Sequence, residues 1–199
     1  MHMPILARFF SIALVSSALL AGCEAPPPHL EFPDLRFTAE PPLQIDVGRL
    51  EVQDIYRMPY HEPDVEHLFP VTPLHALENW AHDRLRPVGT GGRVVMQILN
   101  ARVVEVELPV RQGLQGAFTT QPSERYDLSI EATVQVYDAH GLLARTANVK
   151  TERSQSTLQG ITPDERDRTW YNMTQAAMVA FDRQMETEIR NNFGLFLVR

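Results

Sequence analysis

The stretch YDLSIEATVQVY, residues 126–137, alternates apolar and polar side chains along its whole length. A period of two residues is typical of a β-strand with one face buried and the other exposed. The polar side chains, from Asp127 to Gln135, define a sheet face that meets either solvent or a polar partner. The core-facing set is Tyr126, Leu128, Ile130, Ala132, Val134 and Val136.

Further strands are predicted on both sides of this stretch. Asp138-Ala139-His140-Gly141 is typical of a hairpin turn, since Gly141 tolerates positive φ, and a strand resumes from Leu143 to Val149. Before it, residues 93–108 read as one long strand, and residues 43–52 as an earlier strand bent at Gly48.

Two helices are predicted by their starting residues. Thr72-Pro73 is typical of an N-cap followed by proline at the first helical position, and Pro87 is expected to end that helix. Thr162, Pro163 and Glu165 form a second start with a capping box. An amphipathic stripe follows, ending at a Gly194 cap: Trp170, Met173, Ala177, Phe181, Met185, Ile189 and Phe193.

The element order β-α-β-β-β-α predicts an α+β fold. Its expected form is a two-layer sandwich with two helices on one face of a four-stranded, mostly antiparallel sheet. Residues 43–199 are expected to form this single domain, with Trp80 and Trp170 anchoring the helices. The apolar end, residues 195–198, is expected to fold back onto the body.

The start of the chain carries a different signal. Arg8 precedes an apolar run from Phe9 to Leu20, which at about a dozen residues is too short to span a bilayer. The run ends in Leu20-Ala21-Gly22-Cys23, which resembles the lipobox of bacterial lipoproteins. The resemblance implies that residues 1–22 are a cleaved signal peptide. It also implies that Cys23, the chain's only cysteine, is acylated (with palmitate among the acyl chains) and anchors the protein to a membrane.

Residues 23–42 are expected to join this anchor to the domain. Six prolines lie between residues 24 and 42, and proline without periodicity gives a stiff, extended spacer. The alternatives are a peptide ligand for a partner, or packing of Leu30, Phe32, Leu35 and Phe37 on the domain. An acidic residue after the cysteine can favour retention in the inner membrane, but the usual signal is aspartate and this chain has Glu24. A lipid anchor on the periplasmic side of the outer membrane is therefore expected over one in the inner membrane.

Composition excludes several classes of function. The chain has 199 residues, of which 44% are hydrophobic and 22% charged, so it is not a disordered chain. A single cysteine cannot form an internal disulfide or a cysteine-based zinc site. The net charge of −7 argues against nucleic-acid binding. No catalytic or phosphate-binding motif is present in the sequence, so neither an enzyme nor a bound cofactor is expected.

One polar cluster, residues 61–67, is a candidate site. Histidines and carboxylates stand together there, and these are ligands for zinc or another divalent ion, although the spacing matches no defined metal motif. The other interpretations are a loop that contacts a partner protein and a plain surface loop. The candidate residues are His61, Glu62, Asp64, Glu66 and His67.

With its lipobox, proline segment and element order, the chain resembles small Gram-negative envelope lipoproteins. Two groups have this build: the lipopolysaccharide-assembly lipoprotein that plugs an outer-membrane barrel, and the auxiliary lipoprotein of ABC-type lipid transport systems. The resemblance implies a non-enzymatic accessory subunit with an envelope protein partner. The alternatives are a periplasmic protein that binds a lipid or another small hydrophobic ligand, and a metal-dependent protein using His61 and His67.

Overall fold

The computed structural model describes residues 30–110 and 121–198, and confirms the predicted α+β class. Three short strands lie before and after the first helix, and three long strands lie between them and the second helix. The elements are β1 (Leu43–Ile45), β2 (Leu50–Asp54), α1 (Pro73–Arg84), β3 (Leu85–Pro87), β4 (Arg93–Glu107), β5 (Pro122–Tyr137), β6 (Leu143–Leu158) and α2 (Pro163–Phe193).

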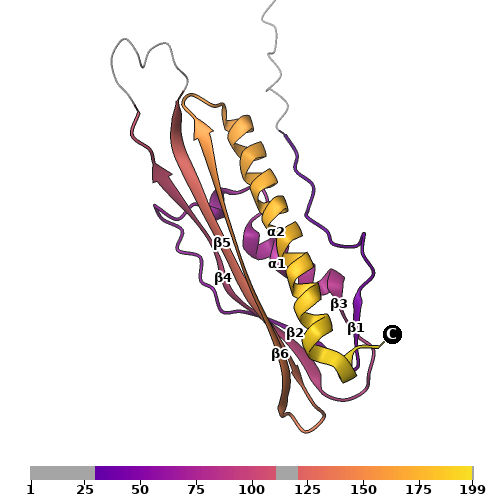
Figure 1. The fold of residues 1–199 in the computed structure, drawn as a ribbon. Coiled ribbons are helices and arrows are strands. Elements are labelled where there is room, and N and C mark those ends of the chain that lie inside the picture. Colours follow the sequence, from indigo (N-terminus) through magenta and orange to yellow (C-terminus); the bar gives the residue numbers. More distant parts are fainter. Residues whose placement is uncertain (1–29, 111–120, 199) are drawn as a thin grey trace, which may run out of the picture. The chain divides into compact units, whose positions relative to one another are not determined.

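A four-stranded sheet in the order β2-β4-β5-β6 forms one layer. β5, which contains the alternating stretch, lies between the two other long strands and pairs antiparallel with both. β2 pairs parallel with β4. Both helices lie on the same side of this sheet, with α1 against β4 and α2 against β5 and β6 (Figure 1).

The predicted first strand is divided between two sheets. β1 pairs parallel with β3 in a separate two-stranded sheet, while β2 joins the main sheet. The helix predicted to run to Pro87 ends at Arg84, because its expected last turn is the extended partner of β1. The end of the chain folds back, as predicted: the Val198 amide donates to the Gln44 carbonyl at 3.0 Å.

Local signals for turns and helix ends are confirmed. The Thr72 hydroxyl accepts from the His75 amide, and Thr162 and Glu165 form the reciprocal capping box. Gly194 caps α2, and Gly141 adopts a φ of 81° in the β5–β6 turn. These interactions involve neighbours in sequence, which is why pattern alone locates them.

The core lies between the sheet and the helices. The whole predicted stripe of α2, from Trp170 to Phe193, is buried. Trp80 of α1 packs edge-on against Phe181 of α2 with ring centroids 5.2 Å apart, and Phe69 stacks on Trp170 at 4.8 Å. Both tryptophans are therefore the anchors that the sequence predicted.

A bulge in β4 changes which side chains face the core. The register with β5 shifts between Ile98 and Asn100, so Ala101 lies opposite Ile130 and Glu105 opposite Tyr126. Val104, by contrast, pairs with Asp127 on the face away from the helices. Burial, followed by the nearby Glu124 carboxylate, raises the pKa of Glu105.

The proline-rich segment is not a spacer over its whole predicted length. The compact unit that contains the sheet begins at Glu31, and Leu35 is buried in its core. The Asp83 carboxylate of α1 accepts from the Arg36 guanidinium and, at 2.9 Å, from the Phe37 amide. Residues 31–42 therefore follow the alternative in which apolar side chains pack on the domain. Residues 1–29, including the predicted signal peptide, lie outside the described residues.

Candidate functional site

The β2–α1 loop, residues 55–72, contains the candidate cluster and lies against the second half of β4. The Val65 amide donates to the Val103 carbonyl at 3.0 Å, and the Glu105 amide donates to the Pro63 carbonyl at 2.9 Å. Asp64 forms an isolated bridge with Val104. Residues 63–65 thus continue the sheet edge beyond the end of β2, and backbone hydrogen bonds hold the middle of the loop in place.

Glu66 is fully buried beneath this loop. It accepts hydrogen bonds from the Tyr56 hydroxyl and, at 3.1 Å, from the Val103 amide. Burial and the hydrogen bond to Glu66 raise the pKa of Tyr56 far above its usual range. The phenol therefore stays protonated and donates a hydrogen bond to the Glu66 carboxylate. A buried carboxylate with two donors fastens the loop to β2 and β4.

Asp64 is also buried and is also paired within the chain. It is 3% exposed and forms an ion pair with Arg102 of β4 through both guanidinium branches, one of them at 3.3 Å. The hydrogen bond to Asp64 raises the pKa of Arg102. Such a bidentate pair sets the orientation of both side chains. The two carboxylates nearest the centre of the cluster are thus turned inward.

The structure does not bring the remaining candidates together with these carboxylates. The His61 ring donates from Nδ1 to the Glu62 carbonyl at 2.9 Å, while both residues stay exposed. His67 lies beside Tyr60 with ring centroids 5.5 Å apart, and its Nδ1 has no partner. Among residues 30–110 and 121–198, no group of three or more His, Cys, Asp or Glu side chains is arranged to hold a metal ion.

The loop exposes three large apolar side chains among its exposed polar ones, which the sequence did not predict. Ile55, Tyr60 and Leu68 expose 52%, 70% and 55% of their surfaces. Tyr60 also holds a φ of 58°, a left-handed conformation that a bulky residue rarely adopts. The sequence signal was the presence of large apolar residues in a proline-rich loop with no helical or strand period. We call these three side chains the exposed apolar residues of the loop.

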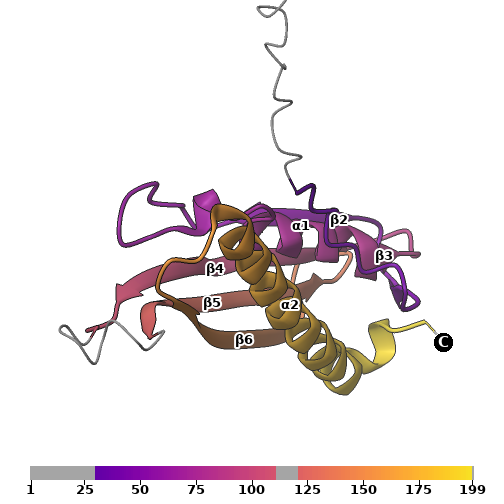
Figure 2. The same ribbon diagram turned by 90° about the horizontal axis from the view of Figure 1, so that it is seen from above.

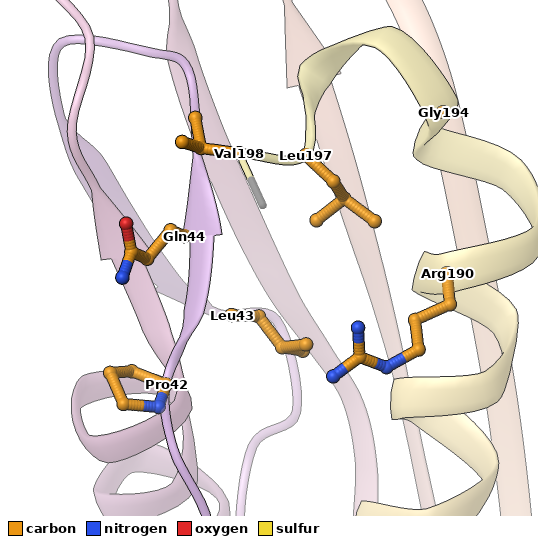
Figure 3. Close-up of a pocket in the computed structure, with 7 residues that line it drawn as sticks. All are labelled: Pro42, Leu43, Gln44, Arg190, Gly194, Leu197 and Val198. Atoms are coloured by element: carbon orange, nitrogen blue, oxygen red, sulfur yellow. The ribbon is translucent and has the colours of Figure 1, made fainter.

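Two clefts lie elsewhere on the surface of the domain. One, of about 320 Å³, lies between the start of β1, the end of α2 and the returning C-terminal segment. Figure 3 shows the Arg190 guanidinium directed across it toward Leu43, and Arg190 is already paired with Glu186 at 2.6 Å. The other, of about 200 Å³, is more apolar and lies between Leu35, Phe37, Met178 and Val179.

The lipobox candidates Leu20, Ala21, Gly22 and Cys23 lie outside the described residues. Within the part of the chain that the structure describes, no helix is both long and apolar enough to cross a bilayer.

Comparison with known proteins gives distant likenesses only. No protein-family model matches the chain, and no curated protein matches it. Two similar solved structures are the minor lipoprotein from Acinetobacter baumannii and the rare lipoprotein B from Shewanella oneidensis. The first is 14% identical over 72% of this chain and 93% of the other, with a TM-score of 0.34. The second is 14% identical over 71% of this chain and 97% of the other, with a TM-score of 0.34.

Proposed function

We propose that the protein is a lipid-anchored, non-enzymatic interaction subunit of a Gram-negative envelope complex for lipid transport or outer-membrane assembly. In this proposal the exposed apolar residues of the β2–α1 loop contact a partner protein in the periplasm. The observation that carries it is the orientation of the loop. Asp64 and Glu66 are turned inward and paired, whereas Ile55, Tyr60 and Leu68 are turned outward.

This orientation favours binding for two physical reasons. Burying a large apolar side chain that was exposed contributes about 1.5–3 kcal/mol, and aromatic residues such as Tyr60 frequently dominate interface energies. A loop already held by Glu66, Asp64 and backbone hydrogen bonds also loses little conformational freedom on binding. The left-handed Tyr60 supports the same interpretation, because backbone strain is concentrated at functional sites.

The anchor is proposed from the sequence of residues 20–23. A thiol is required for acylation, so Cys23→Ser should leave the precursor uncleaved and remove the lipid. Fractionation of cells that express wild type and Cys23→Ser measures this directly. A Cys23→Ser protein that is processed and sediments with membranes as wild type does would contradict the lipoprotein proposal. Separation of inner and outer membranes tests the proposed outer-membrane location.

The interaction role is tested by extracting the full-length protein from membranes in several mild detergents and measuring native mass. Wild type should migrate in a complex whose mass is not a whole-number multiple of the chain's own mass. A Tyr60→Ala/Leu68→Ala double variant should lose this complex while remaining folded. Leu142→Ala removes a leucine that is 67% exposed on the β5–β6 turn, and it should behave as wild type. Wild type that elutes without any other protein in every detergent would refute the proposal.

A second candidate function is binding of a lipid or small hydrophobic ligand in the apolar cleft beside Leu35 and Met178. Its volume of about 200 Å³ is below the ~300–1,000 Å³ of typical ligand pockets, so it favours this function less strongly. Native mass spectrometry of the purified protein distinguishes ligand binding from the interaction role. A co-purified hydrophobic molecule that is lost in Met178→Trp would support this function over the first.

A further inference from the structure

The β6 strand forms an open edge of the main sheet. It pairs with β5 on one side, and no other described strand pairs with it on the other. Figure 2 shows β6 at the margin of the sheet, with α2 crossing its helix-facing side. Most of its 16 residues are exposed, the buried ones being Ala147, Val149, Thr151 and Thr157. An edge of this length presents a row of backbone donors and acceptors to another strand.

We propose that this edge binds a second copy of the same chain. The two β6 strands would run antiparallel about a two-fold axis through Thr151, which joins two four-stranded sheets into one. Thr151 lies at the middle of β6 (Leu143–Leu158), so this register lets the strands overlap over nearly their full length. Antiparallel residues that lie directly opposite point to the same face of the sheet.

Charge complementarity supports this register. An axis at Thr151 places Lys150 opposite Glu152 of the second copy, twice in each dimer. Both side chains are available, since they are 51% and 65% exposed and lie on the sheet face away from the helices. Within one chain they already form an ion pair at 2.6 Å, so the dimer would extend this pair into a four-charge cluster.

The neighbouring registers are disfavoured by the same charges. An axis at Lys150, Glu152 or Arg153 would place that residue opposite its own copy. An axis at Val149 would place Arg145 opposite Arg153 of the second copy. Like charges that lie directly opposite are destabilising, so within two residues of the centre only Thr151 avoids repulsion.

Thr151 is compatible with a position on the axis. It is 6% exposed and lies on the helix-facing side of β6 with Ala147 and Val149. On the proposed axis it lies opposite Thr151 of the second copy, and β-branched side chains pack well across paired strands.

Sedimentation velocity of the full-length protein in detergent tests the proposal. Wild type should be a dimer, and Lys150→Glu or Glu152→Lys alone should weaken it about tenfold, because two attractive pairs become repulsive. Mixing the two variants should restore the dimer. In the mixed pair, positions 150 and 152 of one chain are both acidic and face basic residues at positions 152 and 150 of the other. Arg145→Glu is the matched control, because Arg145 faces Thr157 of the second copy and its reversal should leave the dimer unchanged.

A cysteine pair provides a test that does not depend on charge reversal. Oxidised Thr151→Cys should cross-link to itself, whereas Ser154→Cys, which faces Asn148 of the second copy, should not. The parent chain, with Cys23 alone, sets the background. A wild type that is monomeric at 100 µM (about the highest working concentration), a dimer that resists both single reversals, or a mixture that fails to associate would each overturn the proposal.

Discussion

The buried guanidinium of Arg84 joins three parts of the chain, and breaking its main ion pair is the most informative stability test. Its side chain is 1% exposed. It donates to Asp182 at 2.9 Å, to Glu186 at 2.5 Å and to the Pro41 carbonyl at 2.5 Å. Asp182 also accepts from the indole of Trp80 at 2.8 Å. We therefore choose Asp182→Ala as the perturbation.

The expected cost follows from the groups that lose their partner. Removing one member of a buried ion pair costs about 3–5 kcal/mol, and a stranded indole N–H costs about 1–3 kcal/mol. Glu186 still neutralises Arg84, and Asp182 itself is 16% exposed, so these costs overlap and are reduced. We expect Asp182→Ala to lose about 3 kcal/mol of unfolding free energy. Asp182→Asn keeps an acceptor for Trp80 and should lose about 1–2 kcal/mol.

Urea denaturation followed by tryptophan fluorescence measures these differences, and thermal unfolding provides a second reading. For a domain of this size, 3 kcal/mol corresponds to a melting temperature lowered by about 6–12 °C. Arg183→Ala, at an exposed neighbouring position of α2, should change stability by about 0.5 kcal/mol or less. If Asp182→Ala also lies within that range of wild type, the network does not hold the helices together, and the reasoning is wrong.

Two further predictions concern the N-terminal segment and the loop. The Arg36 hydrogen bond lowers the pKa of Asp83 in the folded protein below its usual 3.8. The stability that Asp83 contributes is therefore present above pH 3.8 and is lost as pH falls through the pKa of the folded state. The melting temperatures of wild type and Asp83→Asn should therefore differ at pH 7, and the difference should shrink progressively as pH falls below 3.8; a gap that stays constant would contradict this. Tyr60→Gly relieves a left-handed backbone and should raise unfolding free energy by up to about 1 kcal/mol. Detergent extraction should nevertheless show loss of the partner, and a clear fall in stability would mean that the contact of Tyr60 with His67 contributes more than the backbone strain costs.

Local features could be predicted from sequence because their interactions are local. Thr72 and Thr162 bond to backbone amides three residues away, and the β5–β6 turn depends on Asp138 and Gly141. The alternation of residues 126–137 correctly placed a strand between antiparallel neighbours, since its period of two leaves one consistent choice of faces.

Features that depend on distant residues could not be predicted. Arg84 meets Asp182 across 98 positions of sequence, and no periodicity connects them. The pairing of β1 with β3 similarly depends on how α1 returns the chain. For the candidate site, the sequence showed that the polar cluster lies in a loop but not which of its side chains face inward, because only tertiary contacts show that Asp64 turns toward Arg102.

The bulge in β4 interrupts the strict alternation of that strand. Leu99 is the extra residue that lets Ile98 and Ala101 both face the core. Because Ile98 and Asn100 pair with consecutive residues of β5, position 99 is where β4 could lose one residue without moving any later side chain to the other face. A period of two carried straight through Leu99 would instead place Val103 outside and Val104 in the core. Alternation alone would therefore misassign the inside and outside of half a strand.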